Sequence, residues 1–234
     1  MQTLCTQCEN LGINLTKTQA DMFKQYMDYL LEFNSHTNLT AITESDEVQI
    51  KHFFDSIILS KFLKIEPDFK VIDVGTGAGF PGVPLKILLP DIKLTLVDSL
   101  NKRVKFLNEL CEKLNLKAEI FHARAEELSH KVEFREKFDI AVSRAVAKLN
   151  VLSEYCLPYV KVGGFFAALK GDNAAEEINS ARDAIKKLGG KIESVQTFEL
   201  PLNMGNRTIV IIKKIKETDK KFPRSNSQIS KNPM

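Results

Sequence analysis

The stretch VIDVGTGAGFPG, residues 71–82, places four glycines within eight positions directly after a β-branched apolar run. Gly75, Gly77 and Gly79 form a GxGxG pattern, and Gly77, Gly79 and Gly82 also satisfy GxGxxG. Glycines let a ligand approach the backbone closely, and the start of the helix expected next offers free N–H groups. The number of glycines therefore favours a ligand-binding strand-turn-helix over a simple tight turn.

Strand-like and helix-like segments alternate outward from this turn. Strands are predicted at 70–74, 93–97, 117–121, 138–142 and 164–169, and helices at 81–89, 100–115, 148–157 and 173–188. Such alternation is typical of a parallel sheet with helices on both faces. Two further strand-like runs, 191–200 and 207–215, have no helix between them, so we expect a terminal hairpin with one antiparallel strand. The predicted fold class is α/β with a seven-stranded, mostly parallel sheet.

Two amphipathic segments, 18–33 and 44–63, are predicted helices that precede this sheet. Thr43 and Asp46 have the spacing of a capping box at the second helix. In the polar loop SHTNLTAIT between the helices, His36 and Asn38 are candidates to reach over a ligand cleft, whereas His52 on the second helix is interpreted as structural.

Charge and composition limit the class of protein. Of 234 residues, 44% are hydrophobic, and the formal net charge is +3. The four cysteines are too few and too scattered for a disulfide framework, and no signal peptide or membrane span is evident, so we expect an intracellular chain. From Lys213 onward the sequence has seven basic and two acidic residues, which indicates a polyanion partner or simply a soluble tail. Because residues after Lys216 lack apolar periodicity, the tail is expected to be mobile in isolation.

Asp98 points to an adenosine-bearing cofactor. It ends the strand-like run LTLVD nineteen residues after Gly79, where a carboxylate can accept hydrogen bonds from both ribose hydroxyls, although it could also cap the next helix. Asp73, just before the glycines, could face the ammonium end of S-adenosyl-L-methionine but would repel a pyrophosphate. These residues favour S-adenosylmethionine and leave an NAD-dependent oxidoreductase as an alternative.

Eight motifs in this order resemble one known family. They are NLTAI (38–42), His52 with Asp55 and Ser56, DVGTGAGFPG (73–82), VDSLNKR (97–103), RAE (124–126), SRAVA (143–147), LKG (169–171) and FPR (222–224). The chain resembles the bacterial small-subunit (16S) ribosomal RNA guanine-N7 methyltransferases, also called glucose-inhibited division protein B. The resemblance implies a class I methyltransferase (Rossmann-like) fold and methyl transfer to ring nitrogen 7 of a guanosine in 16S rRNA. The implied organisation is a helical extension (1–63), a methyltransferase domain (64–215) and a basic tail (216–234).

The resemblance also implies a set of site residues. The cofactor contacts carried over are Gly75, Phe80, Asp98, Ser99, Leu100, Ala125, Glu126 and Arg144, to which the glycine turn adds Asp73, Gly77 and Gly79. Arg144 could instead hold the guanine oxygen or a phosphate. Lys170 and Arg207, at the sheet edge where ligands bind, are candidate base or phosphate contacts or else solvated strand ends. We therefore assign Arg144, Lys170 and Arg207 as the candidate catalytic residues.

The expected chemistry requires neither a general base nor a metal. Nitrogen 7 of guanine already carries an exposed lone pair, so catalysis depends on orientation. The segment Ser143-Arg144-Ala145-Val146 is not the Asn/Asp-Pro-Pro-aromatic cluster of exocyclic-amine methyltransferases. Cys111 and Cys156 fit apolar helix faces, and Cys5 and Cys8 lack a second pair for zinc.

The expected partner is 16S rRNA, within a small ribosomal subunit or an assembly intermediate. We expect a cytoplasmic monomer with no membrane association. A non-catalytic RNA-binding module and a small-molecule methyltransferase remain alternatives, because a cofactor fold alone does not identify the methyl acceptor.

Overall fold

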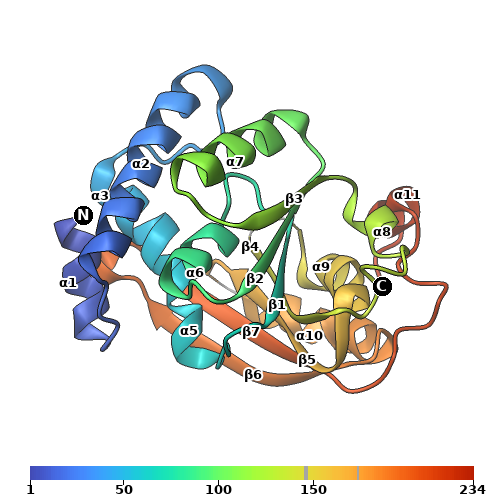
Figure 1. Cartoon of the computed structure of the whole chain (residues 1–234). Coiled ribbons are helices and arrows are strands. Elements are labelled where there is room, and N and C mark those ends of the chain that lie inside the picture. The colour runs from blue at the N-terminus through green and yellow to red at the C-terminus, as the bar shows by residue number, and fades with distance from the viewer. Residues whose placement is uncertain (145–146, 173) are drawn as a thin grey trace.

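The computed structural model describes residues 1–144, 147–172 and 174–234 (Figure 1). Its strands are β1 (Lys70–Val74), β2 (Lys93–Asp98), β3 (Ala118–His122), β4 (Phe138–Arg144), β5 (Val160–Lys170), β6 (Gly190–Glu199) and β7 (Asn206–Lys214). The seven predicted strands are confirmed, although β5 begins at Val160 and not at 164. Ala145 and Val146 of the SRAVA motif, and the first residue of the helix expected at 173–188, lie outside the described residues.

The strands form one sheet in the order β3-β2-β1-β4-β5-β7-β6. Strands β1 to β5 pair in parallel, whereas β7 lies antiparallel to both β5 and β6. The predicted single reversed strand is thereby confirmed. Because β7 runs backwards beside β5, its first residues lie at the carboxyl edge of the sheet, where Lys170 pairs with Thr208. This reversal brings Arg207 close to the ends of the parallel strands.

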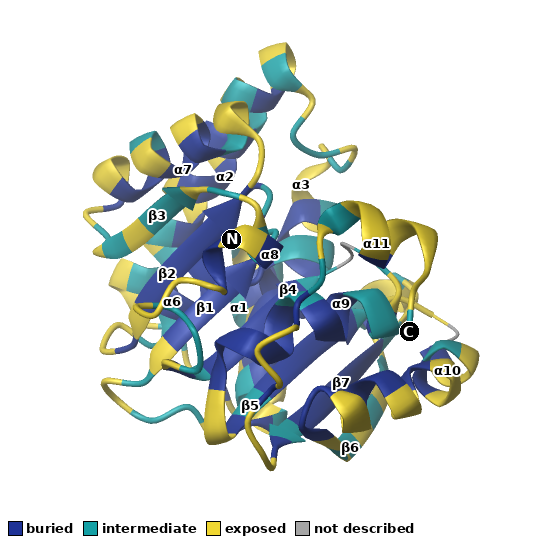
Figure 2. Ribbon diagram, turned by 90° about the vertical axis from the view of Figure 1, so that its right-hand side faces the viewer, coloured by how far each residue is buried: buried dark blue, intermediate teal, exposed yellow. Residues whose placement is uncertain are grey.

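Helices cover both faces of the sheet (Figures 1 and 2). On one side lie α6 (Gly82–Leu88), α7 (Asn101–Lys113) and the N-terminal helices; on the other lie α9 (Leu149–Cys156) and α10 (Ala174–Lys187). Strand side chains alternate between these two apolar layers: Val71 of β1 packs in the first layer and Ile72 in the second. The sheet is therefore buried on both faces.

The N-terminal region adds helices to the first layer. They are α1 (Gln2–Asn10), α2 (Lys17–Thr37), α3 (Ser45–Glu47), the π-helix η1 (Val48–Phe54), α4 (Asp55–Ile57) and α5 (Leu59–Phe62). The helix α1 was not among the sequence predictions, and the helix predicted over 44–63 contains the π-helical segment. The expected capping box at Thr43 and Asp46 is wrong, because α3 begins after Glu44 without a side-chain cap. A capping box instead joins Thr16 and Gln19 at the start of α2.

The C-terminal tail, expected to be mobile in isolation, packs against the domain. Its helix α11 (Asn226–Lys231) contacts α9, and Phe222 and Ile229 are buried. Arg224 forms an ion pair with the buried Glu154. Single apolar residues in irregular chain leave no periodic signal, which explains why the sequence pattern did not reveal this packing.

The remaining short helices are α8 (Ala125–Leu128), η2 (Leu157–Tyr159) and η3 (Pro201–Asn203). Within the described ranges, no helix combines the length and the apolar character needed to span a bilayer.

Candidate active site

The glycine turn between β1 and α6 has one open side and one packed side. Gly77 has a φ of +63°, and a Cβ added there would meet no atom within 4 Å. Gly79 has a φ of +98°, and its Cβ would lie 2.7 Å from the hydroxyl oxygen of Tyr26. The turn can therefore accept a ligand at Gly77. Gly79, expected to contact the cofactor, instead allows close packing against α2.

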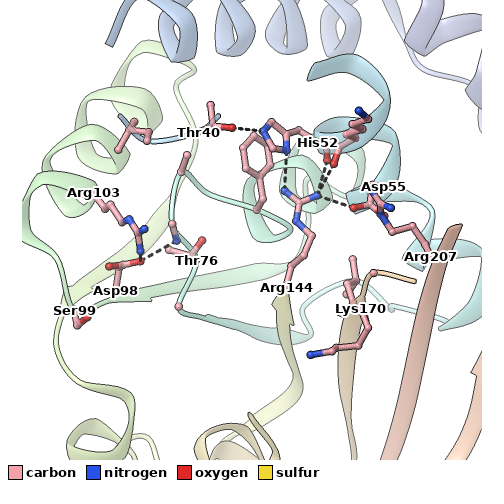
Figure 3. Close-up of a pocket in the computed structure, with 18 residues that line it drawn as sticks. Thr40, His52, Asp55, Thr76, Asp98, Ser99, Arg103, Arg144, Lys170 and Arg207 are labelled. Atoms are coloured by element: carbon pink, nitrogen blue, oxygen red, sulfur yellow. Dashed lines mark hydrogen bonds and ion pairs between the residues drawn. The ribbon is translucent and has the colours of Figure 1, made fainter. Parts of the chain in front are cut away.

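Two adjoining cavities lie at the carboxyl edge of the parallel strands. The larger has a volume of about 650 Å³ and is lined by the glycine turn, η1 and the ends of β4, β5 and β7 (Figure 3). The smaller, of about 160 Å³, is lined by the ends of β1 and β2, the β3–α8 loop, Tyr155 and Asn226. Gly75, Asp98 and Ser99 line both. An elongated ligand could span the two compartments.

Asp98 lies at the junction of these cavities. It is the last residue of β2 and is only 2% exposed. One carboxylate oxygen accepts a hydrogen bond from the Leu100 amide (2.9 Å), and the other accepts from the Gly77 amide (2.9 Å) and from Arg103 (3.3 Å). The Leu100 side chain is 44% exposed and lines neither cavity, so its contribution is the backbone support of Asp98. Ser99 does line the site, as expected.

Asp73 lies beneath the turn and lines neither cavity, which corrects the expectation that it faces the cofactor. Its side chain is fully buried, and Oδ2 accepts hydrogen bonds from Thr76 Oγ1 (2.7 Å) and the Gly82 amide (2.8 Å). Oδ1 has no hydrogen-bond partner among the residues that the structure describes. Burial raises the pKa of Asp73 to about 7, although the hydrogen bonds from Thr76 and Gly82 oppose the shift. Asp73 supports the turn from inside the protein.

The ring of His52 forms part of the wall of the larger cavity. It stacks on Phe80 with a centroid distance of 4.5 Å, and its Nε2 lies 2.8 Å from Thr40 Oγ1 (Figure 3). Burial, followed by the charge of Arg144, lowers the pKa of His52 to about 3, so the ring is neutral at physiological pH. His52 is thus structurally satisfied, as expected, and also lines the site. Phe80 lines it as predicted.

The loop after α2 reaches the cavity through different residues from those expected. Leu39 and Thr40 line it, whereas His36 lies in the last turn of α2 and Asn38 ends that helix at a φ of +52°. Leu39 and Thr40 both belong to the NLTAI motif (38–42) noted in the sequence. Sequence periodicity did not identify them, because the loop conformation depends on tertiary packing.

The π-helix η1 presents Lys51 and His52 to the larger cavity, and Asp55, the first residue of α4, lines it beside them. π-helical segments occur mostly at functional sites. Asp55, at the end of η1, is 3% exposed and forms ion pairs with Arg144 (3.0 Å) and Arg207 (3.3 Å). We did not predict a role for Lys51 or Asp55. The only sequence signal was the motif that contains His52, Asp55 and Ser56.

Arg144, Lys170 and Arg207 all line the larger cavity, but each is partly engaged within the protein. Arg144 donates to the backbone oxygens of Lys51 (3.1 Å) and His52 (3.2 Å) and lies over the Phe80 ring. Its guanidinium therefore binds the end of η1 (Figure 3). Lys170 donates to Ala147 O (2.7 Å) and pairs with Glu177 (2.9 Å).

Ala125 and Glu126 line the smaller cavity only. Glu126, in the first turn of α8, is 7% exposed. Its carboxylate has no hydrogen bond to any residue that the structure describes. The carboxylate is therefore open to the cavity and available to accept a hydrogen bond from a ligand.

The cysteines lie apart from both cavities. Cys8, Cys111 and Cys156 are buried, as expected for core thiols, and burial raises the pKa of Cys111 to about 11. Across residues 1–144, 147–172 and 174–234, no three His, Cys, Asp or Glu side chains come together as metal ligands.

The solved structures that resemble this fold include S-adenosylmethionine-dependent methyltransferases. A structure described as a class I S-adenosylmethionine-dependent methyltransferase from Listeria monocytogenes aligns with a TM-score of 0.59, over 82% of this chain and 68% of that chain, at 13% identity. TYW2 from M. jannaschii, solved in complex with AdoMet, aligns with a TM-score of 0.51, over 69% of this chain and 77% of that chain, at 14% identity. The chain therefore has the class I methyltransferase fold.

The sequence comparisons identify the family. The family model of rRNA small subunit methyltransferase G (GidB) matches residues 19–210. Ribosomal RNA small subunit methyltransferase G of Alkaliphilus oremlandii is 52% identical over 97% of this chain and 95% of its own length. The protein of the same name from Lachnoclostridium phytofermentans is 51% identical over 96% of this chain and 93% of its own length. The chain belongs to the rRNA small subunit methyltransferase G family.

Proposed function

We propose that the two adjoining cavities form one S-adenosylmethionine site with Asp98 at its centre. As a member of its family, the protein is an S-adenosylmethionine-dependent enzyme that methylates ring nitrogen 7 of a guanosine in 16S rRNA. The observation that carries the site proposal is the nearly buried Asp98 carboxylate, which is accessible from both cavities. In this position it can accept hydrogen bonds from ribose hydroxyls while the two ends of the cofactor occupy the two sides.

The residues present fit this cofactor in both compartments. At the larger cavity, the unobstructed Gly77 allows a ligand to approach the backbone. At the smaller cavity, the unpartnered Glu126 carboxylate can accept a hydrogen bond from the amino group of adenine. The NAD alternative is disfavoured because the chain belongs to a methyltransferase family and has a fold shared with S-adenosylmethionine-dependent enzymes.

The cationic side chains of the larger cavity are proposed to receive the RNA. Lys51, Lys170 and Arg207 line it beside the proposed cofactor site and suit phosphate or guanine oxygens. Arg207 contacts Asp55 through Nε and the Asn206 carbonyl through NH1, so we assign NH2 to the substrate. Arg144 is proposed as a positioning residue, because its guanidinium holds η1 against Phe80.

The site can support N7 methylation without removing a proton. S-Adenosylmethionine, when bound, supplies a methyl group on a positively charged sulfur. The nitrogen lone pair of guanine is already free, and the neutral His52 and the ion-paired Asp55 are not needed as bases. The protein contributes orientation and exclusion of water.

The proposed substrate form is a small ribosomal subunit or an assembly intermediate, with the enzyme acting as a monomer. Three regions are proposed: residues 1–63 extend the methyltransferase domain of residues 64–215, and residues 216–234 form the basic tail. Two of the five basic residues of the tail are paired within the protein, Lys221 with Asp219 and Arg224 with Glu154. We therefore assign RNA binding mainly to the cavity rim.

Calorimetric titration tests the cofactor site. The wild-type protein should bind S-adenosylmethionine and not NAD, and Asp98→Ala should weaken cofactor binding at least tenfold because two charge-assisted hydrogen bonds are lost. Asp68→Ala is the matched control, since Asp68 is an exposed aspartate paired with Lys93 far from either cavity. Unchanged binding by the Asp98 variant would refute the assignment.

Transfer of a labelled methyl group tests the substrate. Small subunits and naked 16S rRNA, both from cells that lack the enzyme, are incubated with the protein, and the labelled nucleotide is mapped by mass spectrometry. We expect 7-methylguanosine in the subunit sample. Greater labelling of naked rRNA would refute the subunit proposal, and cofactor binding without any RNA labelling would favour the non-catalytic module or a small-molecule acceptor.

A further inference from the structure

The C-terminal tail forms part of the smaller cavity. Asn226, the first residue of α11, lines this cavity together with Tyr155 of α9 and Glu126 of α8. Asn226 is separated from Glu126 by 100 positions in the sequence, so only the folding of the tail brings them together. The cavity that we assign to adenine therefore has a wall outside the seven-stranded domain.

Buried contacts hold the tail in this position. Arg224 donates to both carboxylate oxygens of Glu154, which is only 1% exposed, at 2.9 and 2.7 Å. Phe222 packs in the apolar layer formed with α9 and α10, and Ile229 is completely buried. Arg135 also donates to the Phe222 carbonyl (2.9 Å). These contacts fix the chain on both sides of Asn226.

The side-chain amide of Asn226 is oriented so that the N–H groups of Nδ2 are available to donate hydrogen bonds. Its Oδ1 accepts hydrogen bonds from Tyr155 Oη (2.8 Å) and Ser230 Oγ (3.3 Å). Its Nδ2 has no hydrogen-bond partner within the described part of the chain. Glu126, on the same cavity, is a nine-tenths buried acceptor without a partner. Among the groups that line this cavity, Glu126 therefore offers an acceptor and Asn226 offers a donor.

We propose that Asn226 is a specificity-determining residue of the cofactor site, where its amide nitrogen donates a hydrogen bond to a ring nitrogen of adenine. This inference rests on the proposed function. Adenine carries the complementary pair of groups, an amino donor and ring-nitrogen acceptors, so Glu126 and Asn226 together can recognise it. Tyr155 is the positioning residue, because its hydroxyl holds the oxygen of Asn226 and directs the nitrogen away from itself.

The test compares ligands that differ only in which nitrogen of the adenine ring, if any, is replaced by CH. S-Adenosylhomocysteine and its 1-deaza, 3-deaza and 7-deaza analogues, each with one ring nitrogen replaced by CH, are titrated calorimetrically into the full-length protein and into Asn226→Ala. Ser227→Ala is the matched control, since Ser227 is an exposed neighbour on α11 that lines neither cavity. Urea unfolding of each variant without ligand verifies that the fold is retained.

We expect Asn226→Ala to bind S-adenosylhomocysteine about fivefold to tenfold more weakly than wild type, the usual effect of one hydrogen bond. For the deaza analogue that lacks the accepting nitrogen, the same substitution should change affinity less than twofold. Tyr155→Phe should give the same pattern with a smaller loss, and Ser227→Ala should match wild type.

Two results would overturn the inference: unchanged binding in Asn226→Ala, or an equal loss for all four ligands, which would show that Asn226 acts only through packing. Failure of the wild-type protein to bind S-adenosylhomocysteine would instead refute the proposed function. The wild-type titration therefore separates the two failures.

Discussion

At the scale of single residues, Asp73 has an unusual environment. Its carboxylate is fully buried, and only one of its oxygens is hydrogen-bonded. An aspartate in an unfolded chain has a pKa near 4, whereas burial raises the pKa of Asp73 to about 7. Between these values the unfolded state releases its proton first. The contribution of Asp73 to the free energy of unfolding should therefore fall as pH rises from about 4 to about 7 and be constant above that range.

Asp73→Asn should remove this dependence, because the amide does not titrate. Relative to the variant, wild type should lose on the order of 4 kcal/mol between pH 4 and 7, as expected for a shift of about three pKa units. Urea unfolding of both proteins at several pH values measures the difference. Parallel stability curves would contradict the prediction.

His52 should remain neutral in the folded protein. Burial and the neighbouring Arg144 lower its pKa to about 3, so its ring NMR signals should not shift between pH 8 and pH 5. Below pH 6.5 the unfolded chain binds a proton at this position and the folded chain does not, so this residue reduces stability as pH falls. The urea-unfolded protein, whose histidines titrate near 6.5, is the control. A titration midpoint of the His52 NMR signals between pH 5 and 8 would contradict the prediction that burial and Arg144 keep the ring neutral.

At the scale of elements, the turn between β1 and α6 separates a packing glycine from a ligand-facing glycine. Gly79→Ala should cost about 3 kcal/mol or more, because the methyl group would lie 2.7 Å from Tyr26 Oη and 2.8 Å from Val83 Cγ2 in a left-handed conformation. Gly77→Ala meets no protein atom, so only the cost of its positive φ, about 1 kcal/mol, is expected.

Gly79→Ala should have the larger effect on stability, whereas Gly77→Ala should have the larger effect on cofactor binding. Gly77→Ala places a methyl group on the open side of the turn, so it should weaken S-adenosylmethionine binding in calorimetry while the protein stays folded. Urea unfolding measures the stability effects. A more stable Gly79→Ala than Gly77→Ala would contradict the assignment of the two sides.

At the scale of the whole molecule, the tail contributes to stability. Removing residues 217–234 eliminates the burial of Phe222 and Ile229, worth about 1.5–3 kcal/mol each, and leaves Glu154 buried without Arg224. The free energy of unfolding in urea should fall by at least 3 kcal/mol. Removing only residues 233–234 is the control and should have little effect. A tail that is mobile would give identical unfolding curves for all three proteins.

The sequence was sufficient to predict the seven strands, the single reversed strand and the locations of Asp98 and the glycine turn. These features depend on local periodicity and on turn chemistry, which neighbouring residues determine. The positions of Lys170 and Arg207 at the cavity followed from the same reasoning, because the carboxyl ends of parallel strands meet at one edge.

Only the tertiary structure decided which side chains face the cavities. The π-helix η1 presents Lys51, the start of α4 presents Asp55, Asp73 is buried in the interior, and the tail places Asn226 at the smaller cavity. Each outcome depends on contacts between segments distant in sequence, such as Arg144 with η1 and Arg224 with Glu154. Contacts between residues distant in sequence produce no local periodicity in the chain. The sequence pattern therefore predicts the strands and the glycine turn, whereas tertiary packing determines which side chains line the cavities.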